Sequence, residues 1–193
     1  MITVGIVHHS STGYTRLLAD AVAEGVSSVG GAKAERLAIA GADIVEGRYQ
    51  NDALLGVLDG CDAIVFGTPT YMGSVSAQTK AFLDASLRRW YSRAWSGKVA
   101  AGFTVSSTPS GDKLNALTDL MICALQHGMI WVGQDESPMN AEGVNRLGCY
   151  LGAVAQPDYA AKQPALVRGD AASGERLGAR VARITAALVA GRS

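Results

Sequence analysis

The chain has 193 residues, of which 48% are hydrophobic and 18% are charged, and its 17 basic and 17 acidic residues cancel. This composition is typical of one folded domain and argues against intrinsic disorder. A chain without net charge lacks the positive field on which non-specific nucleic-acid binding depends, so we expect no nucleic-acid partner.

Short β-branched runs alternate with segments of helical period, a pattern typical of a parallel sheet covered by helices. Strands are predicted at residues 2–7, 33–39, 62–67, 99–105 and 129–132. Helices are predicted at 13–28, 52–59, 76–87, 113–126 and 173–190. Residues 135–170 are predicted to form an extended insertion or loop before the last helix. Because such long segments often have a function, residues 135–160 are a candidate oligomer contact.

The sequence gives no indication of a membrane segment or of a metal site. No apolar run reaches the roughly 18 to 20 residues that a membrane span requires, and residues 1–7 are typical of a buried strand rather than a signal peptide. Cys61, Cys123 and Cys149 are far apart and lack metal-ligand spacing, which favours reduced thiols in a cytoplasmic protein. His8 and His9 point to opposite sides of a strand and form no metal pair. We therefore expect no membrane partner and no metal.

Three predicted strands are followed by loops rich in hydroxyl groups and small residues. The first loop consists of Ser10, Ser11, Thr12, Gly13, Tyr14 and Thr15. The second loop consists of Pro69, Thr70, Tyr71, Met72 and Gly73. The third loop consists of Ser106, Ser107, Thr108, Pro109, Ser110 and Gly111. Because ligands bind beyond the carboxyl ends of the strands in an open parallel sheet, these loops are predicted to converge on one site.

The first loop favours a phosphate group, because it offers several hydroxyl donors at the start of a helix whose N–H groups are free. It lacks the lysine of a GxxxxGK[ST] motif, so a nucleoside triphosphate is disfavoured. The alternative is a simple helix cap. In the second loop, Tyr71 and Met72 suit a flat apolar ring, but the same residues also occur in a plain strand-to-helix turn. The third loop can likewise be a plain turn, which Pro109 and Gly111 would explain. Trp90 and its aromatic neighbours are compatible with either a substrate roof or core packing. The GxSxG motif of serine hydrolases is absent.

The segment F-G-T-P-T-Y-M-G-S-V-S-A-Q-T-K-A-F-L-D, from Phe66 to Asp84, resembles a motif of the WrbA-like family of flavodoxin-fold NAD(P)H:quinone oxidoreductases. The S-S-T-G-Y-T loop is similar to the phosphate loop of this family, and H-G-M-I-W-V-G is similar to its fifth strand. Trp90 matches a family tryptophan that lines the quinone pocket. The resemblance covers nearly the whole chain and is weakest at 40–60 and 135–170.

The resemblance implies a flavodoxin-like α/β three-layer sandwich over residues 1–193, with a five-stranded parallel sheet in the order 2-1-3-4-5. It also implies that the first loop holds the phosphate of FMN, that Thr70 to Gly73 line its ring, and that Ser106 to Gly111 contact the pyrimidine edge and ribityl chain. The implied activity is ping-pong hydride transfer from NAD(P)H through FMN to a quinone or a similar small acceptor, in a homodimer or homotetramer.

Two positions depart from the family pattern. Thr12 replaces an aromatic residue that can stack on the nicotinamide dinucleotide, and Gln126 replaces the first histidine of H-H-G-M. Gln126 can donate a hydrogen bond to a flavin or quinone but cannot supply a proton at neutral pH. The departures leave FMN binding intact and weaken the inference of efficient quinone reduction. Two alternatives therefore stay open: a flavodoxin-type electron carrier, and a non-catalytic protein that binds flavin or a partner.

Overall fold

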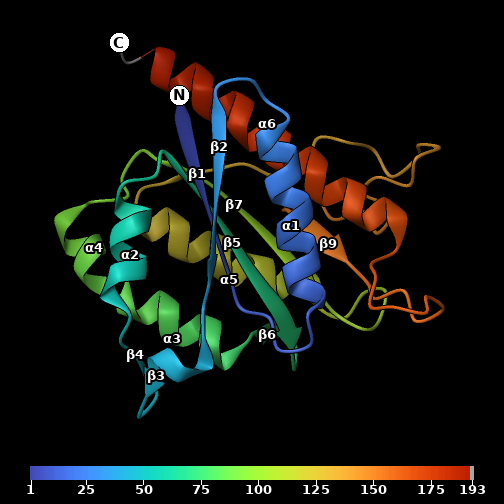
Figure 1. Cartoon of the computed structure of the whole chain (residues 1–193), viewed down its shortest axis with the longest axis horizontal. Coiled ribbons are helices and arrows are strands. Elements are labelled where there is room, and N and C mark those ends of the chain that lie inside the picture. The colour runs from blue at the N-terminus through green and yellow to red at the C-terminus, as the bar shows by residue number, and fades with distance from the viewer. Residues whose placement is uncertain (192–193) are drawn as a thin grey trace.

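The computed structural model describes residues 1–191 and has three layers, a central sheet with helices on both faces (Figure 1). In chain order the elements are β1 (Ile2–His8), α1 (Tyr14–Ser27), β2 (Ala32–Ala38), a 3-10 turn (Gly41–Asp43), β3 (Ile44–Val45), β4 (Arg48–Tyr49), α2 (Asp52–Asp59), β5 (Ala63–Tyr71), β6 (Ser74–Val75), α3 (Ala77–Ala85), α4 (Leu87–Ser92), β7 (Val99–Val105), α5 (Lys113–Gln126), β8 (Ile130–Trp131), β9 (Ala153–Ala155) and α6 (Arg168–Ala190). Among the described residues, no helix is both long and apolar enough to cross a bilayer.

The main path of the sheet is β2-β1-β5-β7-β8, with every neighbouring pair parallel. This path confirms the predicted order 2-1-3-4-5. The sheet has seven strands rather than the predicted five, because β6 pairs antiparallel with β5 and β9 pairs parallel with β7. The predicted fifth strand, 129–132, is present as the two residues of β8, which pair with the start of β7. The chain then leaves the sheet and returns as β9, which pairs with the end of β7.

The alternating direction of strand side chains divides the core into two halves. In β5, Ala63 and Val65 belong to the cluster under α1 and α6, whereas Ile64 and Phe66 belong to the cluster under α2, α3 and α5. Both faces of the central strands are therefore covered, which explains why they are continuous apolar runs in the sequence.

Helices α1 and α6 approach each other closely because glycines lie at their crossing. A Cβ atom on Gly25 would lie 1.9 Å from the carbonyl oxygen of Glu175, and a Cβ atom on Gly178 would lie 2.0 Å from that of Val22. Both distances are shorter than any real contact of a Cβ atom. The second half of α1 is thus held by direct backbone packing against α6.

The predicted bounds of α2, β7 and α5 match the structure. The other predicted elements differ by at least one residue, and the largest differences are in three of them. The segment 76–87 ends as a helix at Ala85 and is followed by the separate helix α4, and α6 begins at Arg168 rather than at 173. Strand β5 continues to Tyr71 instead of ending at 67, because its last residues form a hairpin with β6. The two turn residues of this hairpin, Met72 and Gly73, have φ angles of 47° and 81°, as a type I′ turn requires.

Candidate functional site

The three loops predicted from the sequence lie at one edge of the sheet. Strands β1, β5 and β7 are consecutive neighbours in parallel register, so the loops at their carboxyl ends are adjacent. A side-chain hydrogen bond between Tyr71 and Ser11 joins the second loop to the first. The structure thus brings together the hydroxyl-rich segments that the sequence singles out.

The first loop presents a row of free backbone donors at the start of α1. Gly13 is the N-cap residue, with φ of 91°, and caps the helix with no side chain. The only capping hydroxyl is that of Ser10, which accepts from the Arg16 N–H at 3.2 Å. The four N–H groups from 12 to 15 have no hydrogen-bond partner within residues 1–191. A helix cap therefore accounts for one hydroxyl of this loop, and the remaining donors suit an anion.

The second loop places an aromatic and a thioether side chain at the surface. Tyr71 and Met72 are both exposed, Met72 fully so. The turn between them and β6 is held from α5, where the side chain of Asn115 donates to the Gly73 carbonyl at 2.7 Å. The side chain of Thr70 is buried, and its hydroxyl lies 2.8 Å from that of Thr104 on β7. Pro69 is likewise inside the sheet, opposite Val105.

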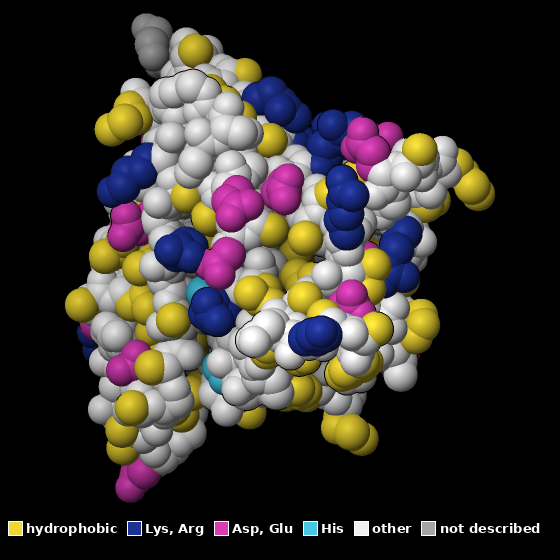
Figure 2. All heavy atoms as spheres, turned by 45° about the vertical axis from the view of Figure 1, so that its right-hand side comes forward, with side chains coloured by type: hydrophobic (Ala, Val, Ile, Leu, Met, Phe, Trp, Pro, Cys, Tyr) yellow, Lys and Arg dark blue, Asp and Glu magenta, His cyan; other side chains and the backbone are white. Residues whose placement is uncertain are grey.

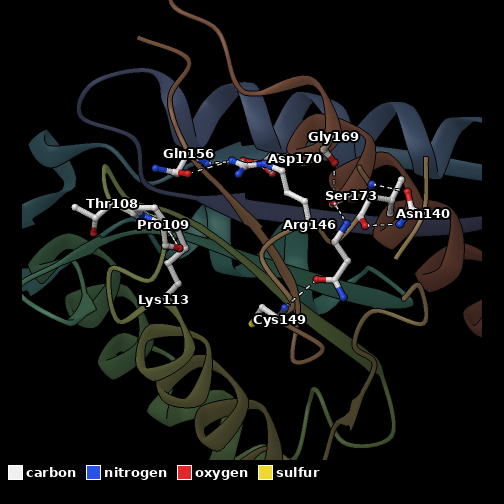
Figure 3. Close-up of polar contacts among 12 residues, drawn as sticks. Thr108, Pro109, Lys113, Asn140, Arg146, Cys149, Gln156, Gly169, Asp170 and Ser173 are labelled. Carbon is white, nitrogen blue, oxygen red and sulfur yellow. Dashed lines mark hydrogen bonds and ion pairs between the residues drawn. The ribbon is translucent and has the colours of Figure 1, made fainter. Parts of the chain in front are cut away.

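The third loop is held from behind by two long side chains. The Lys113 ammonium donates to the carbonyls of Thr108 and Pro109 at 2.6 and 3.1 Å, as Figure 3 shows. Gln156, which follows β9, donates from its side chain to the Ser107 carbonyl at 3.0 Å. The outer surface of this loop, from Ser107 to Ser110, is exposed.

Gln156 and Tyr159 belong to the site, and the sequence analysis missed both. The Tyr159 hydroxyl lies 2.9 Å from the Ser107 hydroxyl, and its ring packs edge-on against Tyr14 with centroids 6.5 Å apart. The segment after β9 therefore connects the first loop to the third. The same rule that found the other loops applies here, because β9 is also a parallel strand that ends at this edge.

A buried histidine supports the base of the first loop. His9 Nδ1 lies 2.9 Å from the hydroxyl of Ser76, the N-cap of α3. Burial lowers the pKa of His9, and burial also lowers that of His8. Both imidazoles are therefore neutral at pH 7. Within the described residues, no three His, Cys, Asp or Glu side chains gather as metal ligands would.

Trp90 and Gln126 lie together, but away from the three loops. They line one groove of about 890 Å³ between α3, α4, α5 and β6. The groove reaches Ser74, which follows the second loop, but no residue of the three loops lines it. Gln126 is the last residue of α5, and the third loop comes just before the first residue of this helix. The length of α5, about 21 Å, therefore separates Gln126 from the third loop. Trp95, by contrast, is fully buried and its indole N–H donates to Asp59 at 2.7 Å, which favours packing for this aromatic residue.

The donors at the sheet edge fit FMN. A phosphate dianion suits the free N–H groups and hydroxyls of the first loop. Exposed Tyr71 and Met72 offer apolar surface to a flat ring, and the third loop offers polar groups to its edge. No lysine or arginine is required, because the helix start supplies the positive potential.

Comparisons with known proteins agree with this geometry. The family model described as "NADPH-dependent FMN reductase" matches residues 2–142. Flavodoxin FldP of Pseudomonas aeruginosa is 39% identical over 93% of this chain and 94% of its own length. An NAD(P)H dehydrogenase (quinone) of Trichlorobacter lovleyi is 31% identical over 98% of this chain and 100% of its own.

A crystal structure described as a flavodoxin, WrbA-like protein from Agrobacterium tumefaciens superposes with a TM-score of 0.74 at 37% identity, covering 97% of this chain and 99% of that one. The flavodoxin-like fold is thereby confirmed at the level of backbone geometry. With the matched model and these relatives together, the chain belongs to the NADPH-dependent FMN reductase family, and within it to the WrbA-like proteins.

Proposed function

We propose that this protein binds FMN across the first, second and third loops and uses it to transfer electrons from NAD(P)H to a quinone or a similar small acceptor. The observation that carries the proposal is the row of four free N–H groups from 12 to 15, placed beside exposed Tyr71. Together they provide a phosphate site next to a surface for a flat ring.

In this proposal the first loop holds the phosphate, Tyr71 to Gly73 lie against the ring, and the third loop contacts the pyrimidine edge and the ribityl chain. Bound FMN supplies the capacity to accept a hydride and to pass on two electrons. The chain orients the ring and leaves one face open, because the second loop is exposed. A single open face that serves both substrates in turn predicts ping-pong kinetics.

We also propose that the chain forms a homodimer or homotetramer. Trp90 and Gln126 lie at the far end of α5 from the third loop, and in this proposal they border a flavin held by another copy. The surface around them is apolar: Leu87, Trp90, Tyr91, Ile122 and Leu125 are exposed on α4 and α5. Residues 135–160 are a second candidate contact. Light scattering that reports a monomer at micromolar concentration would contradict this assembly.

The decisive experiment compares FMN with riboflavin, which lacks the phosphate. Charge-assisted hydrogen bonds contribute about 1.5 to 3 kcal/mol each, so two of them predict that FMN binds at least about 100-fold more tightly. Fluorescence quenching measures both dissociation constants, with inorganic phosphate as a competitor. Equal affinity for the two flavins would exclude the first loop as the phosphate site. The loaded protein is then tested for NADH and NADPH oxidation, which benzoquinone should accelerate.

One observation favours a second candidate, a flavodoxin-type electron carrier: the relative at 39% identity is named a flavodoxin. Such carriers are usually strongly acidic, to bind basic partners. This chain has no net charge, and on the face in Figure 2 acidic and basic side chains are interspersed. A carrier would bind FMN but would not oxidise NAD(P)H without a reductase protein.

We also propose that the protein is located in the cytoplasm, because Cys61, Cys123 and Cys149 are free thiols and thiols stay reduced there.

A further inference from the structure

Lys113 is the most buried lysine of the site. Only 2% of its surface is exposed, and lysine is almost never buried to this extent unless it is paired. Within residues 1–191 it has no ion pair. The carboxylate that acts on it electrostatically, that of Asp170, already accepts from the Arg146 side chain and from the Gln156 N–H, each at 2.8 Å. The ammonium group is instead directed at the third loop (Figure 3).

Three consecutive carbonyls of the third loop are held from inside the protein. Gln156 donates to the Ser107 carbonyl, and Lys113 donates to those of Thr108 and Pro109. The C=O and N–H of one planar trans peptide point in opposite directions. The Thr108 and Ser110 N–H groups therefore point away from these side chains, and neither has a partner in the described chain. Proline has no N–H, so Pro109 adds no competing donor.

We propose that Lys113 is a positioning residue of the FMN site, which fixes the third loop so that two backbone N–H groups face the flavin's pyrimidine edge and places a positive charge behind that edge. The proposal rests on the FMN site proposed above. Negative charge gathers on this edge when the flavin is reduced, and both the aligned donors and the ammonium stabilise it. Lys113 acts through the loop and does not itself touch the ring.

The protonation of Lys113 gives this arrangement a pH dependence. Burial lowers the pKa of Lys113 to about 8, with Asp170 and Cys149 raising it and Arg146 lowering it. Bound FMN is negative and raises the pKa further. Below pH 8 the lysine is charged in both states, so binding takes up no proton. Above pH 8 the free protein loses this proton and binding must restore it, so FMN affinity falls as the pH rises.

Lys98 provides a matched control. Its ammonium also donates to backbone carbonyls, those of Leu58, Asp59 and Cys61, and burial also lowers its pKa. It precedes β7, whereas the third loop follows the same strand. Seven strand residues, about 23 Å, therefore separate Lys98 from the site, and K98M should change stability without changing how FMN binding depends on pH.

The test measures the FMN dissociation constant from pH 7 to 9.5, and the midpoint potential of bound FMN, for the wild type, K113M and K98M. If FMN raises the pKa of Lys113 by one unit, the wild-type dissociation constant increases about tenfold above pH 8. K113M should bind more weakly at pH 7 and show no such increase. Its potential should fall by about 30 mV for each tenfold loss of preference for reduced FMN. K98M should behave as the wild type does.

A K113M protein that keeps the wild-type pH dependence and potential would overturn the proposal. A measurement on the wild type alone covers the case in which K113M does not fold. Calorimetry in two buffers of different ionisation enthalpy should detect proton uptake with FMN at pH 8.5 and none at pH 7, and equal uptake at both would also overturn it. Absence of FMN binding by the wild type would instead contradict the proposed function itself.

Discussion

Replacing Asp170 with alanine should destabilise the protein by about 3 kcal/mol. Its carboxylate is 1% exposed and accepts three hydrogen bonds, two from the Arg146 guanidinium and one from the Gln156 N–H, all at 2.8 Å. Breaking a buried ion pair costs about 3 to 5 kcal/mol when the partner charge stays buried. The Arg146 side chain is 31% exposed and regains some water, which lowers that cost. The unpaired Gln156 N–H adds about 1 kcal/mol.

Urea denaturation measures this loss, and D20A is the matched control. Asp20 also lies beside two arginines, Arg16 and Arg36, but its side chain is 26% exposed and those of its partners more than half exposed. Exposed pairs contribute about 0 to 1 kcal/mol, so D20A should lose less than 1 kcal/mol. If D170A loses no more than D20A, then Asp170 does not anchor the segment that carries Gln156, and the physical argument for the third loop loses one of its two supports.

Three further predictions concern packing, a buried polar pair and the missed tyrosine. G178A should cost about 2 kcal/mol in urea denaturation, because overpacking costs more than the helix propensity gained; G56A, whose Cβ meets nothing within 4 Å, should be neutral or stabilising. T104V should cost about 1 to 3 kcal/mol by leaving the Thr70 hydroxyl buried without a partner, and the double variant T70V/T104V should recover most of it. Y159F should weaken FMN binding by a few-fold, about 1 kcal/mol, with unchanged stability; an unchanged dissociation constant would remove this tyrosine from the site.

Elements with a clear apolar pattern in the sequence were predictable. The bounds of β7 follow from an apolar run that is buried throughout, and those of α5 follow from a helical period. The first and third loops were placed by the same reasoning, since a loop after a buried parallel strand must lie at the ligand edge. The extension of β5 to Tyr71 was not predictable in this way, because it depends on pairing with the two residues of β6.

Strand β9 shows the limit of local patterns. Its three residues, Ala153 to Ala155, carry no period and little β propensity, and they form a strand only because β7 offers an unpaired edge there. Missing β9 meant missing the loop that follows it, and with it Gln156 and Tyr159. This loop, from Gln156 on, contains no serine, threonine or glycine before residue 169, so its composition did not single it out as the other three loops were singled out.

Lys113 did leave a signal in the sequence. A cation at the first residue of a helix faces the positive end of the helix dipole, which is unfavourable; the only acidic residue beside it is the N-cap Asp112, whose side chain makes no capping hydrogen bond. The structure shows what offsets this cost, namely two loop carbonyls that point back at the ammonium. A lysine placed against the dipole and then buried loses its hydration and gains in return two hydrogen bonds that order the third loop. In our proposal, the ordered third loop is what this buried lysine contributes to FMN binding. Deprotonation of Lys113 removes that contribution, so the pH dependence of FMN binding tests the role of this residue directly.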